Sequence, residues 1–418
     1  MKHHARTAKT ALVVGVVAVS SLLFTACSTP GGSGSDTQGE LRILANITPA
    51  LTKEYYQKLV EPFVKSHPGV TVTIESPSGK DVQSTLQQEL ASGATPDIVA
   101  SNLDPVVAPQ MTAFPDTDWV KATPLAEENK VDGKIWQVAT GAQIQSLVYY
   151  NKDAFTKAGI TEPPTSLKEF TADLALLQGA GYVPLQTAGE WVTGAQFAMM
   201  ANPELLGSDP DWYAKRNEKK VTFADSAYAT YLDAYADWIA SGGVAKDALG
   251  VKYQDSINNF VAGKSATFVM GNWLVPELDA AKLGFEVGVF ATPTIDGSAP
   301  KQLSGAAQPY SILKNSKHQK LALELVQYLV SDKDAIATSL KSEGNFRQGV
   351  TYEGSPLNTE VAGVLDASPG SVIGTSGPGI NSGFGNELNT AVQSLYTGKS
   401  GKEAAAALDE WWDANVAK

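Results

Sequence analysis

Few residues in this chain could catalyse a reaction, and their spacing does not form a catalytic site. A hydrolytic triad needs a histidine, and beyond the first four residues the chain has only His67 and His318, both in polar segments. A glycosidase needs two facing carboxylates, and no pair stands out among the 44 acidic residues. Gly263-Lys264-Ser265 is like the end of a phosphate-binding loop, but Asn258 stands where that loop needs a glycine. The sequence therefore favours binding without catalysis, cofactor or metal.

Tryptophans beside polar residues in predicted loops indicate what could be bound. A sugar has apolar C–H faces and a rim of hydroxyls, so a sugar site needs flat rings together with amides or carboxylates. Trp273 follows a predicted strand end, where crevices of α/β domains lie, and Trp191 follows Glu190 in a second predicted loop. We expect Trp273 to stack on a ligand, with core packing as the alternative. Trp191 suits either role equally.

Polar side chains near strand ends form a second group of candidates. Asn46 ends the first predicted strand, and Asn102 and Asp104 follow the strand that begins at Asp97. The remaining polar candidates lie in later loops or next to segments of small residues: Gln143, Gln145, Glu190, Asn272, Gln308 and Arg347. Each could bind a hydroxyl, and a turn or cap role is the alternative. Glu190 and Asp104 could each accept two hydroxyls, and for these two a solvated surface acid is the alternative.

Strands and helices must position these side chains. The sequence of the first hundred residues clearly predicts such strands and helices. Apolar periodicity predicts strands over 41–44, 70–74 and 97–100, and helices that begin near Thr52 and Val82. Gly93 should end the second helix, and Pro62 should kink the first or end it early. This β-α-β-α-β order predicts a parallel sheet covered by helices.

The rest of the chain continues the alternation of helices and strands. Ser166 and Glu169 have the spacing of a capping box before a helical stripe. The apolar pattern then predicts helices and one strand at these positions: helix 225–239, strand 266–270, helix 318–331 and helix 402–416. We therefore expect a second α/β region after residue 149.

The N-terminus has the pattern of a secretion signal. Lys2, Arg6 and Lys9 precede an apolar run over 11–24, which is too short for a comfortable membrane span. The run leads to Cys27 and resembles a bacterial lipobox, whose cysteine receives a diacylglycerol, although Phe24 departs from the usual pattern. We expect a signal peptide over 1–26, a lipid on Cys27 and a flexible tether over 27–39. An ordinary secretion signal with an incidental cysteine is the alternative.

Length and composition limit the remaining possibilities. With 418 residues, of which 43 % are hydrophobic, the chain suggests two globular domains. The formal net charge of −12 and the lack of a basic cluster argue against a nucleic-acid partner. Cys27 is the single cysteine, so no internal disulfide can form and cysteine-rich zinc modules are excluded.

Several motifs resemble those of one protein family and occur in its order. They are Phe63-Val64-Lys65-Ser66-His67-Pro68-Gly69-Val70, the Pro96-Asp97-Ile98-Val99 turn, segments 132–136 and 149–170, Phe260-Val261-Ala262-Gly263-Lys264 with Gly271-Asn272-Trp273, and segment 312–330. Together they are similar to the extracellular solute-binding proteins of carbohydrate ABC importers, the maltose-binding-protein-like family.

This resemblance implies a two-lobe periplasmic-binding-protein fold of type II, α/β in each lobe, with a ligand cleft between the lobes. It implies an N-terminal lobe over 40–148 and 296–345 and a C-terminal lobe over 149–295 and 346–418, with Trp273 as a stacking residue. The implied function is capture of a sugar or oligosaccharide by lobe closure and its delivery to an ABC permease. We expect a monomer, lipid-anchored at the outer face of the cytoplasmic membrane. A secreted carbohydrate-active hydrolase and a surface adhesin remain the alternatives.

Overall fold

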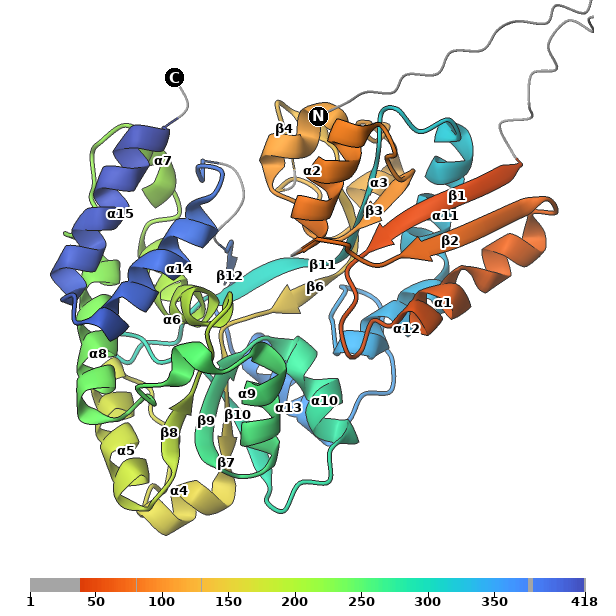
Figure 1. The fold of residues 1–418 in the computed structure, drawn as a ribbon. Helices are drawn as coiled ribbons and strands as arrows, with labels where there is room; N and C mark the ends of the chain where they lie inside the picture. Colours follow the sequence, from red (N-terminus) through yellow and green to blue (C-terminus); the bar gives the residue numbers. More distant parts are fainter. Residues whose placement is uncertain (1–37, 80, 129, 375–378, 417–418) are drawn as a thin grey trace, which may run out of the picture. The chain divides into compact units, whose positions relative to one another are not determined.

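The computed structural model is a mixed α/β structure built on two main sheets (Figure 1). It describes residues 38–79, 81–128, 130–374 and 379–416. The predicted signal over 1–26, Cys27 and nearly all of the predicted tether therefore lie outside the described residues. The chain passes from the first sheet to the second between β6 and β7, returns between β10 and β11, and leaves the first layer again after α12.

The first sheet contains the strands predicted near the N-terminus. Its strands are β1 (Gly39–Ala45), β2 (Val70–Glu75), β3 (Ile98–Ala100), β6 (Val138–Ile144), β11 (Gln302–Ile312) and β12 (Ser371–Val372). The order is β12-β11-β3-β1-β2, with β6 paired to β11. Ile43 of β1 lies opposite Ile74 on one side and Ile98 on the other, both in parallel register, which confirms the β-α-β-α-β prediction. Strand β11 runs antiparallel to β3 and β6.

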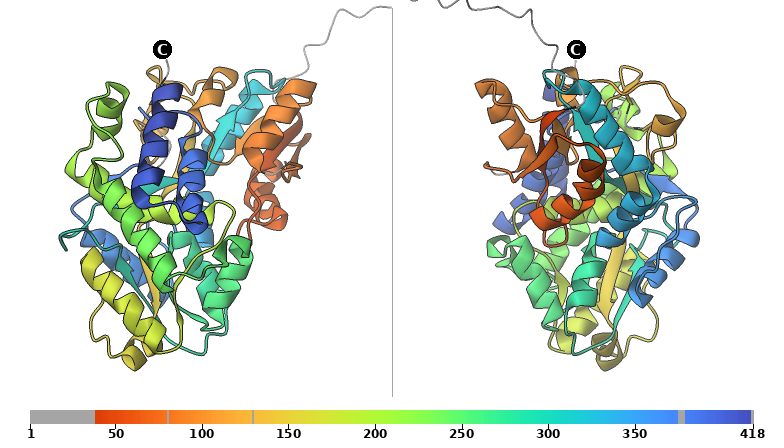
Figure 2. Two further views of the ribbon diagram at one scale, coloured as in Figure 1. Left: turned by 60° about the vertical axis from the view of Figure 1, so that its left-hand side comes forward. Right: turned by 90° about the vertical axis from the view of Figure 1, so that its right-hand side faces the viewer.

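Helices cover this first sheet and close its core. They are α1 (Lys53–Ser66), α2 (Val82–Ser92), α3 (Asp118–Lys121), α11 (Gln319–Ser331), α12 (Lys333–Glu343) and the 3-10 turn η1 (Pro105–Gln110), beside the hairpin β4 (Lys130–Val131) and β5 (Lys134–Ile135). Helix α1 lies beside α11 and α12 (Figures 1 and 2). Phe63 and Leu325 are buried where these helices meet the strands.

A capping side chain sets the start of helix α1, whereas a proline inside the helix does not end it. The Thr52 hydroxyl accepts a hydrogen bond from the N–H of Tyr55 and so caps the start of the helix. Of the two effects expected of Pro62, an early end of this helix is wrong, because α1 continues to Ser66. Pro62 and Lys58, whose carbonyl loses its helical donor, both lie on the exposed face. Water can therefore satisfy that carbonyl, and the buried face compensates for the lost hydrogen bond.

The second sheet has four strands in the order β10-β7-β9-β8. They are β7 (Leu147–Asn151), β8 (Val183–Gln186), β9 (Ser265–Met270) and β10 (Val287–Ala291). The helices of this layer are α4 (Lys152–Ala158), α5 (Leu167–Gly179), α6 (Val192–Ser208), α7 (Trp212–Asn217), α8 (Ala227–Ser241), α9 (Tyr253–Val261), α10 (Val275–Ala280), α13 (Pro356–Asp366), α14 (Phe384–Ser394) and α15 (Gly401–Asn415), with the 3-10 turns η2 (Ala248–Gly250), η3 (Asn272–Leu274) and η4 (Leu395–Thr397). The predicted capping box of Ser166 and Glu169 starts α5, which confirms that prediction.

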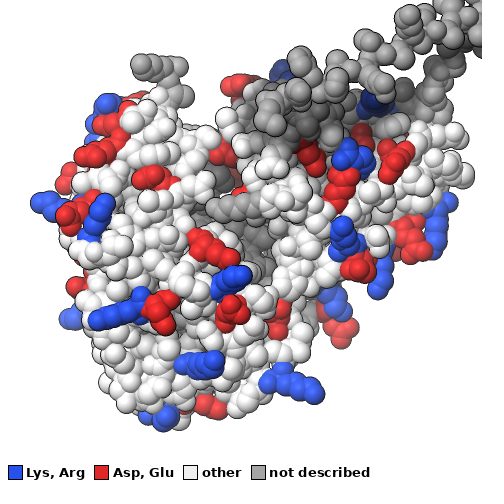
Figure 3. All heavy atoms as spheres, in the orientation of Figure 1, with Lys and Arg blue, Asp and Glu red and all other residues white. Residues whose placement is uncertain are grey.

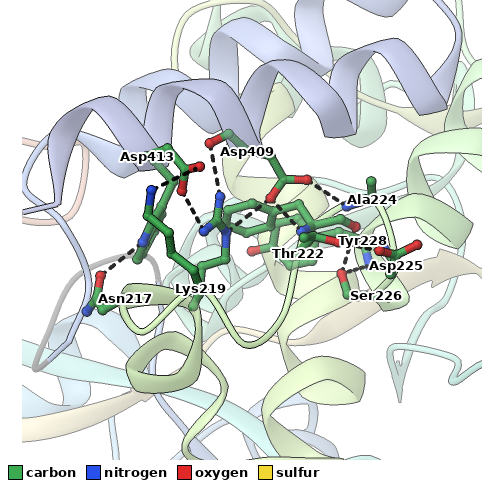
Figure 4. Close-up of polar contacts among 12 residues, drawn as sticks. Asn217, Lys219, Thr222, Ala224, Asp225, Ser226, Tyr228, Asp409 and Asp413 are labelled. Atoms are coloured by element: carbon green, nitrogen blue, oxygen red, sulfur yellow. Dashed lines mark hydrogen bonds and ion pairs between the residues drawn. The ribbon is translucent and has the colours of Figure 1, made fainter.

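The C-terminal helix α15 is held to the second layer by an ion-pair network (Figure 4). The Arg216 guanidinium is 2 % exposed and lies 3.0 Å from Asp409 Oδ1 and 2.8 Å from Asp413 Oδ1. Asp409 also accepts hydrogen bonds from the N–H groups of Phe223 and Ala224. Trp412 is fully buried on the same helix and donates to Asn217. These contacts make α15 part of the core.

Acidic and basic side chains are interspersed on the face shown in Figure 3. Within the described ranges, no helix combines the length and the apolar character needed to cross a membrane. No group of three or more His, Cys, Asp or Glu in those ranges is placed to hold a metal ion.

Candidate functional site

A small pocket with three aromatic rings brings together residues from both layers of the fold. It has a volume of about 190 Å³, and we call it the aromatic pocket. Its lining residues are Asn46, Thr48, Pro49, Ala50, Gln143, Trp191, Tyr253, Trp273, Glu277 and Glu343. Four of these, Asn46, Gln143, Trp191 and Trp273, are candidates predicted from the sequence.

The three rings come from loops and helix starts of the second layer. Trp191 and Tyr253 have ring centroids 4.9 Å apart and planes inclined at 52°. Trp191 is 43 % exposed, which is unusual for so large an apolar ring and leaves a face free for a ligand. Trp273 lies in η3, directly after β9, and its ring folds back over Gly271. A Cβ at Gly271 would lie 2.0 Å from that ring, so only glycine permits this placement.

The first layer supplies amide groups to the same pocket. Asn46 follows β1, and its main-chain N–H donates to the carbonyl of Ala100 at 3.0 Å. Its side-chain amide makes no hydrogen bond to any described residue. Gln143 lies in β6 and accepts a hydrogen bond from Gln145 Nε2 at 3.2 Å, which leaves its own amide N–H groups unpaired among the described residues. Both amides are therefore available to ligand hydroxyls.

Two carboxyl groups complete the lining, and the sequence reasoning did not identify either of them. Glu277 lies in α10, four residues after Trp273, and burial raises its pKa. Glu343 ends α12 and is 6 % exposed. Burial also raises the pKa of Glu343, against the opposing effect of hydrogen bonds from Asn345 and Gln308. Trp273 lies in the 3-10 turn η3 and Glu277 in α10, so the four-residue spacing between them is not that of one helix face and did not mark Glu277.

A second, wider pocket of about 570 Å³ shares no lining residue with the aromatic pocket. Asn102 and Gln145 line it, together with Trp136, Gln137, Gly305 and Ile380 among others. Gln143 lies in β6 and Gln145 follows its last residue, and the two side chains are joined by the hydrogen bond from Gln145 Nε2 to Gln143 Oε1. Gly305 lies opposite Gln143 on β11, and a Cβ there would lie 2.4 Å from Gln145 Nε2. The lack of a side chain at Gly305 therefore leaves room for the Gln145 amide.

Two acidic candidates lie near the pockets but line neither of them. Glu190 has a positive φ of 53°, and its carboxylate accepts a hydrogen bond from the N–H of Tyr253 at 3.0 Å. Its carbonyl oxygen accepts from Asn389 at 2.6 Å, so Glu190 holds the loop that presents Trp191. The Asp104 carboxylate accepts from Ser382 Oγ at 2.8 Å and from the N–H of Gly383 at 3.2 Å. Asp104 thus connects η1 to the start of α14.

Three further candidates have their polar groups occupied within the fold. Gln308 accepts from Tyr55 at 2.7 Å and donates to Ser342 Oγ at 2.8 Å. Arg347 donates to the carbonyls of Val330, Thr140 and Ala122, and burial lowers the pKa of its guanidinium. Asn272 is fully buried and bonded to main-chain groups.

The geometry therefore does not bring these three side chains to the aromatic pocket or the wider pocket. A polar residue at a loop or strand end can serve the backbone as readily as a ligand, and the sequence does not distinguish the two roles. Tyr253, which the sequence reasoning also missed, is the first residue of α9, and no local motif marks it.

Comparisons with known proteins show which family the chain is similar to. Residues 49–336 match the family model described as bacterial extracellular solute-binding protein. The multiple sugar-binding protein of Streptococcus mutans is 24 % identical over 359 residues, which are 76 % of this chain and 78 % of that protein. The diacetylchitobiose binding protein of Streptomyces coelicolor is 26 % identical over 221 residues, which cover 52 % of this chain and 50 % of that protein.

Solved structures share the fold over nearly the whole chain. A chitin oligosaccharide binding protein has a TM-score of 0.78 at 20 % identity, and the match covers 91 % of this chain and all of that one. A manno-oligosaccharide specific solute binding protein from Bifidobacterium animalis subsp. lactis, in complex with mannotriose, has a TM-score of 0.74 at 22 % identity. That match covers 92 % of this chain and 96 % of the other. The two-domain α/β fold expected from the sequence is thereby confirmed.

Proposed function

Because this chain belongs to the bacterial extracellular solute-binding protein family, we propose that it binds a sugar or oligosaccharide outside the cytoplasm and delivers it to the permease of an ABC transporter. The aromatic pocket is the observation that carries this proposal. Trp191, Tyr253 and Trp273 offer rings for the apolar faces of a sugar, and Asn46 and Gln143 offer amides for its hydroxyls. Relatives named for binding multiple sugars and diacetylchitobiose support the same ligand class.

Binding rather than catalysis is the role that we propose for the site. The two carboxyls of the aromatic pocket are both buried enough to have a raised pKa. A glycosidase needs one protonated and one ionised carboxyl, whereas burial shifts the pKa of both carboxyls in this pocket in the same direction, toward the protonated form. Incubation with oligosaccharides followed by chromatography tests this point. Intact ligand is the expected result, and released product would favour the hydrolase alternative.

Closure of two lobes around the ligand is the mechanism that we propose. The lobes would comprise residues 40–148 with 296–345, and residues 149–295 with 346–418. The rings of the aromatic pocket belong to the second of these, whereas Asn46 and Gln143 belong to the first. Bringing the lobes together would therefore complete the site and present a closed form to the permease. We propose that the protein works as a monomer.

Anchoring to the outer face of the cytoplasmic membrane is also part of the proposal. Cys27 would carry a lipid after removal of residues 1–26, and residues 27–39 would form the tether. The support is the sequence pattern alone, since these residues precede the described part of the chain, apart from Gln38 and Gly39.

A thermal-shift screen of the protein without residues 1–27 tests the proposed function. A ligand at 100 times its dissociation constant stabilises a folded protein by about 2.7 kcal/mol. We expect a clear rise in Tm with at least one saccharide in a panel of mono- and oligosaccharides. A Trp191→Ala, Trp273→Ala double variant is the matched control, and its Tm should not respond. A wild-type Tm that no saccharide raises would contradict sugar binding.

A further inference from the structure

The charged residues that line the aromatic pocket are all acidic. Glu277 and Glu343 line it, and no Lys, Arg or His of the described chain does. The Glu277 carboxylate makes no hydrogen bond or ion pair with any described residue. Two acidic groups thus face one small cavity without a protein cation to balance them, beside three aromatic rings.

Glu343 is the more deeply enclosed of the two. Its Oε2 accepts hydrogen bonds from Asn345 Nδ2 at 3.2 Å and from Gln308 Nε2 at 3.5 Å, and its Oε1 accepts none from the described residues. The other titratable groups that face it, from α1, α9 and β11, are tyrosine hydroxyls: Tyr55, Tyr56, Tyr253 and Tyr310. Apart from Glu277 in the same pocket lining, the titratable groups near this carboxyl, which is 6 % exposed, are therefore tyrosines.

A ligand that neutralises these carboxyls gains more than one that only forms hydrogen bonds. An ionised carboxylate in a buried site is unfavourable unless a cation accompanies it. A neutral hydroxyl can donate a hydrogen bond but brings no charge, whereas an ammonium group provides both. The faces of Trp and Tyr rings also attract cations, as in aromatic cages that bind ammonium ligands. Rings and carboxyls in this pocket thus favour the same kind of ligand group.

We propose that the aromatic pocket takes a sugar unit bearing a protonated amine, in preference to the matching neutral hexose or its N-acetylated form. This inference rests on the proposed sugar-binding function and specifies its substrate class. Trp191, Tyr253 and Trp273 would surround the sugar ring and its ammonium group, while Glu277 and Glu343 would balance the charge.

The preference for an amino sugar should be visible as a coupling between ligand binding and proton release. Burial favours the protonated form of both carboxyls in the free protein, and a bound ammonium group would favour the ionised form. Binding of the amino sugar should therefore release protons. Its affinity should rise with pH until the amine of the ligand itself loses its proton. A neutral sugar should bind without proton release and with little dependence on pH.

Isothermal titration calorimetry with matched ligands is the decisive experiment. The ligands are hexose, hexosamine and N-acetylhexosamine in the gluco, galacto and manno configurations, and the corresponding β-1,4-linked gluco dimers. In at least one configuration, the amino form should bind about tenfold more tightly than its two neutral counterparts. Titrations in buffers of different ionisation enthalpy should show proton release for the amino form alone.

Variants of the two acids test their part in the preference. Glu277→Gln and Glu343→Gln keep the shape of the pocket and should reduce the tenfold preference to about twofold or less. Glu353→Gln removes an exposed acid outside the pocket and should leave the preference unchanged. If Glu343→Gln does not fold, the wild-type ligand series and Glu277→Gln still test the inference.

The other outcomes are distinguishable. Equal or tighter binding of the neutral sugars would overturn the amino-sugar preference and leave the sugar-binding function intact. Binding of choline or glycine betaine as tightly as the amino sugar would show a site for organic cations in general and would overturn the assignment to a sugar. Absence of binding by every saccharide would contradict the proposed function itself.

Discussion

The side-chain oxygen of Asn272 accepts a hydrogen bond from the main-chain N–H of Ile144 at 2.6 Å. The Asn272 amide also donates to the carbonyls of Glu343 and Gly344, each at 2.9 Å, and to Asn345 Oδ1 at 2.8 Å. Ile144 ends β6, and Gly344 follows α12. One buried side chain thus joins η3 to two places where the chain leaves the first sheet. Asn272 also lies next to Trp273, so it fixes the turn that presents this ring.

Replacement of Asn272 should destabilise the fold. Asn272→Ala would leave the N–H of Ile144 and the carbonyl of Glu343 without the partner that Asn272 supplies, whereas the carbonyl of Gly344 would keep Asn358, and an unsatisfied buried group costs about 1–3 kcal/mol. We expect the free energy of unfolding, measured with urea, to fall by at least that amount. Asn386→Ala is the matched control, because Asn386 is exposed on α14 and should change the value by less than about 0.5 kcal/mol. Equal stability of the two variants would contradict the role of Asn272.

Removal of the Trp273 ring should affect binding more than folding. Trp273→Ala should weaken sugar binding by about 1–3 kcal/mol, measured by calorimetry, because stacking on an aromatic face has that magnitude. Its ring is only partly buried, so the fold should persist. Trp412→Ala should do the reverse and cost about 3–5 kcal/mol of stability, since Trp412 is fully buried against Tyr213 and Phe384. If Trp273→Ala instead unfolds the protein, and the fraction that remains folded binds sugar with normal affinity, the ring is a core residue.

The contact of Ser382 with Asp104 should influence lobe closure. Ser382→Ala removes one hydrogen bond to the Asp104 carboxylate, which is worth about 0.5–1.5 kcal/mol. We expect a larger radius of gyration for the ligand-free variant in small-angle scattering, and a weaker affinity for the ligand. Saturating ligand should make both wild type and variant more compact. Identical scattering profiles and affinities for the two proteins would contradict a closing role for this contact.

Glu343 should make stability depend on pH in a defined direction. Burial raises its pKa in the folded protein, so the folded state retains a proton that the unfolded chain has already lost. The free energy of unfolding should therefore fall as the pH rises above the ordinary glutamate pKa of about 4.3. Glu343→Gln should flatten this decrease and be at least as stable as wild type at neutral pH. The curve of Glu353→Gln should run parallel to that of the wild type, and a Glu343→Gln curve parallel to both would disprove this prediction.

Cys27 should determine where the protein is found in the cell. In Cys27→Ser no thiol remains to receive a lipid through a thioether, because the chain has no other cysteine. We expect the protein to move from the membrane fraction to the medium or to an unprocessed pool, as measured by cell fractionation and detergent partitioning. Unchanged partitioning of the variant would contradict lipid anchoring.

Several features of the fold could be predicted from the sequence because they depend on neighbours along the chain. The Thr52 cap, the Ser166–Glu169 capping box and the end of α2 at Gly93 are each formed within a few residues. The alternation of Val70, Val72 and Ile74 likewise sets one strand by itself. The order of these elements was sufficient to predict the parallel pairing of β1 with β2 and β3.

The composition of the site depended on the tertiary structure. Asn46, Trp191 and Trp273 lie far apart in the sequence and meet in one pocket only through the packing of the two layers. Glu343 joins them because α12 ends beside η3, although its own sequence context is that of a helix end. Asn272 looked like a ligand contact because it precedes Trp273, and its four partners come from segments 71–128 residues away. The sequence shows which polar groups each side chain carries. Burial and hydrogen-bond partners from distant segments decide which of these polar groups remain free to bind a ligand.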